Sequence, residues 1–264
     1  MTIWAFGDSF IGDFKNLNYK SEQKKRGIKP WIRAIGEQLN QSVVNHGCPG
    51  SSPDYTYHMF RQERDNIQDN DILIVGISNL FRRWFIKDKP NNTMLNNKKS
   101  ISEQHTSAEF MKAVKYYLIH LNHEELYETY CIDFLYNLDH LTKEKNLHTI
   151  LLPLMYYEYE WLNTDYRHKF NNFHWPNMPL TNVHSNEYEK WYFERIHDII
   201  GMDGKYNHLT WTNHAILTNK IVNNISYKIP LDFKTEFVEG IITHKTIQSP
   251  KFIEREFAAA PDFG

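Results

Sequence analysis

The sequence predicts an α/β protein, a three-layer sandwich in which helices cover both faces of a mainly parallel sheet. Three observations lead to this fold class. Residues 71–77 form a continuous apolar run, typical of a strand that is buried on both faces. Short apolar segments alternate with segments of helical periodicity, as in βαβ units. A chain of 264 residues with 41% hydrophobic and 23% charged residues is long enough for one such core.

Each element has its own local signal. The expected strands are short apolar segments at residues 2–6, 42–45, 71–77 and 148–153, the last ended by its proline. The expected helices are residues 29–39 with Pro30 in the first turn, 54–67, a long helical region at 106–146 that opens on a capping box, and 209–227. A polar stretch at 122–125 is expected to divide the long region into two helices.

The chain is expected to form one domain over residues 1–227. An aromatic-rich insertion occupies about 154–200, and its regular structure is not evident from the pattern. Residues 87–105 are polar and predict an exposed loop. Residues 228–264 continue beyond the α/β pattern as a C-terminal extension, which we interpret as a docking tail for protein assembly.

Composition narrows the possible partners. A formal charge of -2 gives no reason to expect nucleic acid as a partner, and no apolar run approaches the length of a membrane span. Without a signal-peptide pattern we expect a cytoplasmic protein, the alternative being a component of a virus particle. Cys48 and Cys131 are expected to be reduced thiols, and the histidines lack the spacing of a metal site.

The first strand runs directly into Gly7-Asp8-Ser9. This places a serine hydroxyl at the carboxyl end of a buried strand, where open α/β sheets have their active sites. Ser9 is either a cap of the following segment or a nucleophile. We interpret Asp8 as a structural residue that organises the turn.

A serine nucleophile needs a histidine that removes its proton and donors that bind the oxyanion. His208 is a candidate base because it precedes the last helix and has Asp203 and Gly204 upstream. The alternative for His208 is a surface histidine. Asp203 has two roles open to it, as the acid that orients His208 or as a turn-capping residue.

Several segments together resemble the SGNH or GDSL-type hydrolase family. Gly7-Asp8-Ser9-Phe10 resembles its first block, 45–52 its second, 76–80 its third, and His208, with His214 six residues later, its last. The resemblance implies a flavodoxin-like fold, Ser9 as nucleophile and His208 as base. It also implies an oxyanion hole formed by the N–H groups of Ser9 and Gly50 and the amide of Asn79.

The chain departs from this family in two blocks. Two residues separate Gly76 from Asn79 in place of one, and Leu80 stands where the family has an aspartate. Ser78 is therefore an alternative oxyanion donor. In the last block the family's acid lies three residues before the histidine, where this chain has Lys205, so that Asp203 is the nearest carboxylate.

These observations predict an esterase that acts through an acyl-enzyme, needs no cofactor or metal, and removes acetyl groups from carbohydrate. Arg82 is interpreted either as a ligand of a substrate carboxylate or phosphate or as half of a salt bridge. Trp175 is expected either to stack on a sugar or to belong to the core. The alternative function is a virion or other assembly protein that uses this scaffold as a structural or glycan-binding module.

Overall fold

The computed structural model describes residues 1–12, 30–80, 82–84, 124–180 and 211–237, together with Leu209 and scattered positions between 109 and 121. Its sheet has five strands in the order β2-β1-β3-β4-β5, and every neighbouring pair is parallel. The strands are β1 (Thr2–Phe6), β2 (Ser42–Asn45), β3 (Ile72–Ile77), β4 (His148–Pro153) and β5 (Phe173–His174).

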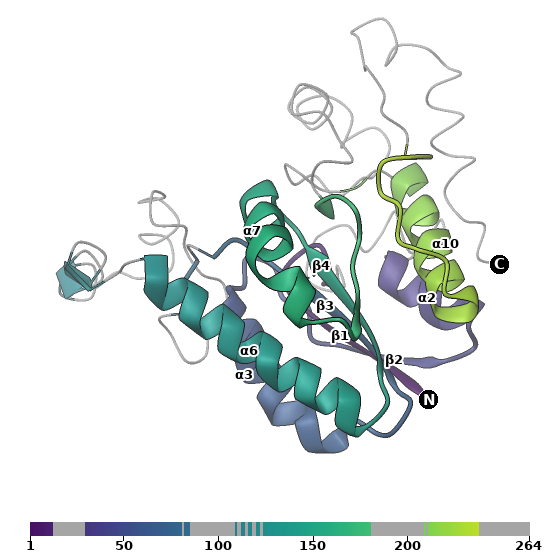
Figure 1. The fold of residues 1–264 in the computed structure, drawn as a ribbon, viewed down its shortest axis with the longest axis horizontal. Coiled ribbons are helices and arrows are strands. Elements are labelled where there is room, and N and C mark those ends of the chain that lie inside the picture. Colours follow the sequence, from purple (N-terminus) through teal and green to yellow (C-terminus); the bar gives the residue numbers. More distant parts are fainter. Residues whose placement is uncertain are drawn as a thin grey trace, which may run out of the picture.

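Helices pack on both faces of this sheet, which confirms the predicted fold class. Figure 1 shows α2 and α10 on one face and α3 and α6 on the other. The helices are α2 (Trp31–Gln38), α3 (Pro53–Glu63), α6 (Glu124–Glu144), α7 (Tyr156–Trp161) and α10 (Trp211–Tyr227). Short helical segments follow α3 at Arg64–Asn66 and α7 at Leu162–Tyr166 and Arg167–Lys169. No described helix is long and apolar enough to span a bilayer.

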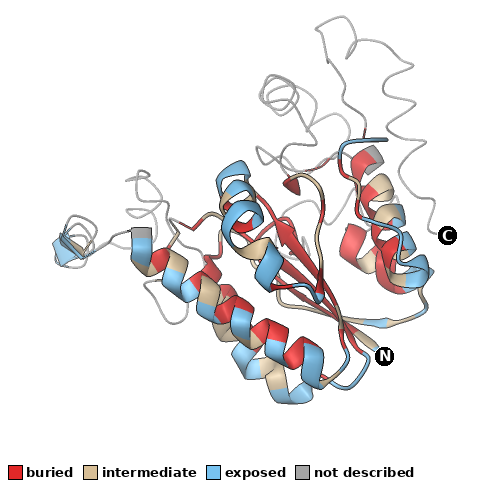
Figure 2. Ribbon diagram, in the orientation of Figure 1, coloured by how far each residue is buried: buried red, intermediate tan, exposed pale blue. Residues whose placement is uncertain are grey.

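The core has two halves because successive strand residues face opposite sides of the sheet. Ile3 and Ala5 of β1 pack with α2 and α10, whereas Trp4 and Phe6 pack with α3 and α6. Figure 2 accordingly shows β1, β3 and β4 buried between partly exposed helices, whereas the edge strand β2 is only partly buried. Both faces of the sheet are therefore covered, as the apolar run of β3 predicted.

Two segments join the core in a way that the sequence pattern did not indicate. β5 comes from the aromatic-rich insertion and adds a fifth parallel strand beside β4. The predicted extension contributes three buried residues to the core cluster between β1 and α2, namely Leu231, Phe233 and Phe237. The rest of the insertion from 181, the predicted exposed loop and the tail from 238 lie outside the described residues, as does part of the predicted helix break at 122–125.

The last helix runs antiparallel to β4. Just after α10, the Lys228 Nζ lies 2.6 Å from Nδ1 of His148, the first residue of β4, and the Asn224 Oδ1 lies 3.0 Å from its Nε2. The end of α10 is thus fixed where β4 begins. Because its 17 residues span about 25 Å, its first turn lies toward the carboxyl ends of the strands.

We expect acid to weaken the fold through His148. Burial, the neighbouring His174 and the charge of Lys228 lower the pKa of His148 from 6.5 to about 4. Between these values the unfolded chain binds a proton that the folded chain excludes, so that stability falls as the pH is lowered through this window. Urea unfolding at pH 7 and pH 5 should show a smaller pH dependence for His148→Gln than for the parent. The exposed His140→Gln serves as control, and an equal effect of both substitutions would contradict the prediction.

Candidate active site

The topology places the switch point of the sheet at the carboxyl ends of β1 and β3. From β1 the chain moves to β2 on one side and then returns to β3 on the other side of β1. In open α/β sheets ligands bind at such a switch point, outside the carboxyl ends of the strands. Ser9 follows β1 and Asn79 follows β3, so both residues lie at this point.

A sharp turn presents Ser9 at the end of β1. Gly7 has a φ of +151°, and a Cβ at this position would lie 2.6 Å from Ile11 Cγ1, so that only glycine fits. The Asp8 Oδ1 accepts a hydrogen bond from the Phe10 N–H at 3.0 Å, which confirms that Asp8 organises the turn. Ser9 retains 9% of its surface exposed.

The loops after β2 and β3 are bonded to this turn and to each other. The Gly7 carbonyl accepts hydrogen bonds from the Cys48 N–H and the Ser51 Oγ, both at 2.9 Å. Between these residues Gly50 has a φ of +75°. The Ser51 carbonyl in turn accepts from the Ser78 Oγ at 2.9 Å. The hydroxyl of Ser78, the alternative oxyanion donor, is thus buried and bonded to the backbone.

Asn45 makes a second connection between β2 and the serine turn. Its Nδ2 donates to the Ile11 carbonyl at 2.7 Å, and its Oδ1 accepts from the Gly47 N–H at 2.8 Å. The two backbones approach so closely that a Cβ on Gly47 would lie 2.4 Å from the Gly12 nitrogen. Three strand-end loops, carrying Ser9, Gly50 and Asn79, therefore form one interlocked unit.

The two arginines after β3 differ in their surroundings. The Arg82 Nη1 forms an ion pair with the Oδ2 of the fully buried Asp8 at 2.7 Å, which is the salt-bridge alternative for this residue. The guanidinium of Arg83 is 3.4 Å from the ring centroid of Tyr127, and only 5% of Arg83 is exposed. Arg82 thus has a protein carboxylate as its counter-ion.

A buried glutamate that the sequence analysis missed joins this unit. Glu158 on α7 has no exposed surface, and its Oε1 accepts from the Leu80 N–H at 2.9 Å. Burial raises the pKa of Glu158, and Asp8 raises it further, while the Leu80 N–H and Arg82 lower it. The sequence signal for Glu158 was weak, because it is an acidic residue within a run of aromatic residues shortly after the end of β4.

Three aromatic rings form a cluster beside the third loop. The Trp84 ring centroid lies 5.2 Å from that of Tyr55 and 4.7 Å from that of His58, both on α3. The backbone N–H of Trp84 donates to the Asp54 Oδ2 at 3.2 Å, which fixes the loop against the start of α3. All three rings are partly exposed.

The remaining predicted site residues lie elsewhere or outside the description. Trp175 lines a cavity of about 330 Å³ together with Lys228. Because Lys228 contacts the beginning of β4, Trp175 lies away from the end of the sheet that carries Ser9. His208 and Asp203 lie outside the described residues, although Leu209 is buried in the core. Among the residues that the structure describes, no group of His, Cys, Asp or Glu is arranged to hold a metal ion.

The chain is similar to known structures, one of which is a bacterial protein. It comes from Desulfitobacterium hafniense DCB-2 and is described as that of "a putative lipolytic protein of G-D-S-L family". The alignment covers 66% of this chain and 76% of the other, with 15% sequence identity and a TM-score of 0.36. No family model and no curated protein matched the chain.

Replacing Asp8 by Asn should destabilise the fold. The amide oxygen retains the bond from the Phe10 N–H, but the guanidinium of Arg82, whose side chain is only 14% exposed, loses its counter-ion, which costs about 3 kcal/mol. Urea unfolding at pH 7 measures the difference, with the exposed Asp133→Asn on α6 as control. An unfolding free energy equal to that of the parent would contradict a role for the ion pair.

Replacing Glu158 by Gln and by Ala should give different results. Glutamine keeps an oxygen that accepts from the Leu80 N–H and removes an acid whose ionisation is disfavoured by burial, so stability at pH 7 should be maintained or increased. Alanine leaves that N–H without its acceptor, at a cost of about 1–3 kcal/mol. Unfolding in urea distinguishes them, and equal losses for both variants would show that the hydrogen bond is not what matters.

Proposed function

We propose that this protein is a serine hydrolase of the SGNH type that cleaves a carboxylic ester, with Ser9 as the nucleophile. The observation that carries the proposal is the interlocking of the loops that bear Ser9, Gly50 and Asn79 at the switch point of the sheet. Loops that are bonded to one another in this way could hold a serine hydroxyl and the donors of an oxyanion hole in a fixed relation, which supports the proposal.

The reaction has two halves. His208 takes the proton of Ser9 as the Oγ attacks the ester carbonyl, and then gives this proton to the departing alcohol as the ester bond breaks. A water molecule, deprotonated by His208, attacks the acyl-enzyme, releases the carboxylic acid and restores the serine. Asp203 orients the imidazole. The direction of α10 supports His208 as the base. The first turn of α10 lies toward the carboxyl ends of the strands, and His208 precedes that helix by three residues.

The oxyanion that develops on the carbonyl oxygen is held by the N–H groups of Ser9 and Gly50 and the side-chain amide of Asn79. The bond between the Ser78 hydroxyl and the Ser51 carbonyl argues against Ser78 as the third donor. Donors fixed before the reaction stabilise the developing charge without reorganisation, which is commonly the largest contribution to catalysis in such sites.

An acetyl group on a carbohydrate is the substrate that we propose. The cluster of Tyr55, His58 and Trp84 lies beside the loop that carries Asn79, and partly exposed rings of this kind offer a flat apolar surface to a sugar ring. The acetyl group is small enough for a serine with 9% exposure.

Hydrolysis of p-nitrophenyl acetate and of acetylated xylan tests the proposal. Ser9→Ala should lower the rate by about 10⁴-fold or more, because no other group forms the acyl-enzyme. Labelling with a fluorophosphonate, followed by mass spectrometry of the peptides, should place the adduct on Ser9 whichever ester is the natural substrate.

The control is Ser42→Ala, which removes a serine at the start of β2 and should leave both readouts unchanged. Hydrolysis by Ser9→Ala at the parent rate would overturn the mechanism. If the parent protein neither hydrolyses esters nor reacts with the fluorophosphonate, the proposed enzymatic function is wrong. The alternative, a structural or glycan-binding module, would then be favoured.

A further inference from the structure

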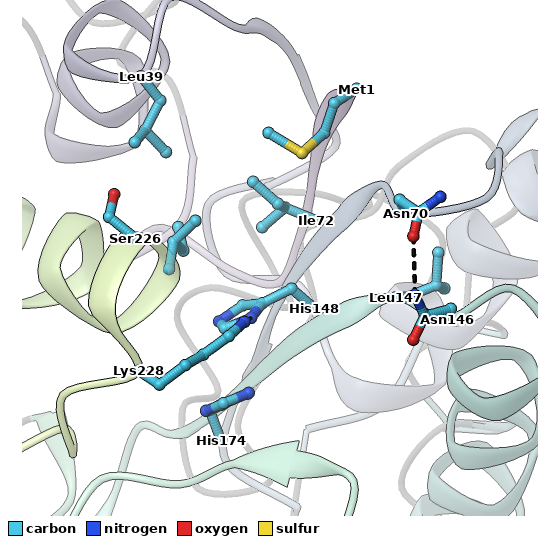
Figure 3. Close-up of a pocket in the computed structure, with 11 residues that line it drawn as sticks. Met1, Leu39, Asn70, Ile72, Asn146, Leu147, His148, His174, Ser226 and Lys228 are labelled. Atoms are coloured by element: carbon cyan, nitrogen blue, oxygen red, sulfur yellow. Dashed lines mark hydrogen bonds between the residues drawn. The ribbon is translucent and has the colours of Figure 1, made fainter.

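A cavity of about 420 Å³ lies at the opposite edge of the sheet, where β1, β3 and β4 begin. Met1, Ile72 and His148 line it from the sheet, and Ile225 and Lys228 line it from the end of α10. Figure 3 shows Lys228 beside the two histidine rings, with Met1, Ile72 and Leu39 across from them. The cavity therefore has a polar side and an apolar side.

The charged side chains among the described lining residues of this cavity and its neighbour are cationic. The cavity shares His174 and Lys228 with the neighbouring cavity of about 330 Å³, to which Arg167 also contributes. Among the described residues that line either cavity there is no aspartate or glutamate. Within the described part of the chain, no carboxylate in the cavities offsets the positive charge of Lys228.

A chain of hydrogen bonds through Lys228, His148, Asn224 and His174 determines which ring nitrogens of the two histidines carry a hydrogen. The ammonium of Lys228 only donates, so His148 Nδ1 is its acceptor at 2.6 Å and His148 Nε2–H donates to Asn224 Oδ1 at 3.0 Å. Asn224 Nδ2 donates to His174 Nδ1 at 3.3 Å, which leaves the hydrogen of His174 on Nε2. The stacked rings, 4.0 Å apart, hold this arrangement in place. With respect to the residues that the structure describes, Lys228 and His174 each keep an N–H for a further partner.

The backbone at Lys228 supports a role for its side chain. Its φ is +59°, and this left-handed position after a helix is the one that glycine usually occupies. A lysine there is strained relative to glycine, and such strain is found where a side chain has a function.

We propose that this cavity binds a small organic anion, with its phosphate or carboxylate group between Lys228 and His174 and its apolar part against Ile72 and Leu39. Lysine is a common phosphate ligand, and an oxyanion accepts from the ammonium and from an imidazole N–H at once. A volume of about 420 Å³ is in the range of small-molecule sites and exceeds what a bare ion needs. This site is independent of the hydrolase function proposed above.

Histidine ring signals in NMR spectra provide the test, with inorganic phosphate and acetate as probes at constant ionic strength. We expect saturable shifts of the signals of His148 and His174, assigned by His148→Gln and His174→Gln. A response to phosphate identifies a phosphate ligand, and a response to acetate a carboxylate ligand. If neither probe shifts these signals, the proposal is wrong.

Variants at Lys228 separate specific binding from general attraction. Lys228→Gln should weaken binding at least about tenfold, because a charge-assisted hydrogen bond is lost. Lys228→Gly should do the same while suiting the backbone, so that a failure to fold does not obscure the result. The matched control is the exposed Lys234→Gln, which should bind like the parent. Equal weakening by Lys228→Gln and Lys234→Gln would overturn the proposal.

Discussion

The buried ion pair between Asp8 and Arg82 is the constraint on which the rest of the site depends. A carboxylate without exposed surface must be paired, and the partner that this chain supplies comes from the loop after β3. The same carboxylate accepts from the Phe10 N–H, and the Phe10 carbonyl accepts from the Trp31 Nε1 of α2 at 2.8 Å. The turn that carries Ser9 is therefore held from the sheet, from α2 and from the β3 loop at once.

A second buried carboxyl competes for the same cation. Glu158 and Asp8 both interact electrostatically with Arg82, but only Asp8 has a direct ion pair with it. Among the described residues Glu158 Oε2 has no hydrogen-bond partner, and burial raises its pKa. One guanidinium cannot fully offset two desolvated charges. Burial therefore favours the neutral form of Glu158, whose Oε1 accepts from the Leu80 N–H and supports the loop of Asn79.

The sequence predicted the elements with a strong local signal and missed the contacts between distant residues. Strands 2–6, 42–45 and 148–153 agree with β1, β2 and β4 to the residue, because each is a short apolar run with clear limits. β5 has only two residues, too few for any periodicity to appear. The partner of Asp8 lies 74 residues away, and no local pattern encodes such a pair. Glu158 was missed for the same reason, since its role exists only once α7 packs against the end of β3.

The two edges of the sheet differ because strands and helices run in opposite directions in a parallel α/β fold. Helix C-termini meet the beginnings of the strands, and their partial negative charge favours a cation there by about 0.3–1 kcal/mol. This effect alone explains a lysine near the end of α10. It does not explain a lysine in the left-handed position itself, bonded to a histidine that burial keeps neutral, because an exposed lysine in the last turn would serve the dipole without strain. The geometry of Lys228, with no carboxylate among the described residues that line its cavity, therefore supports a bound anion as its partner.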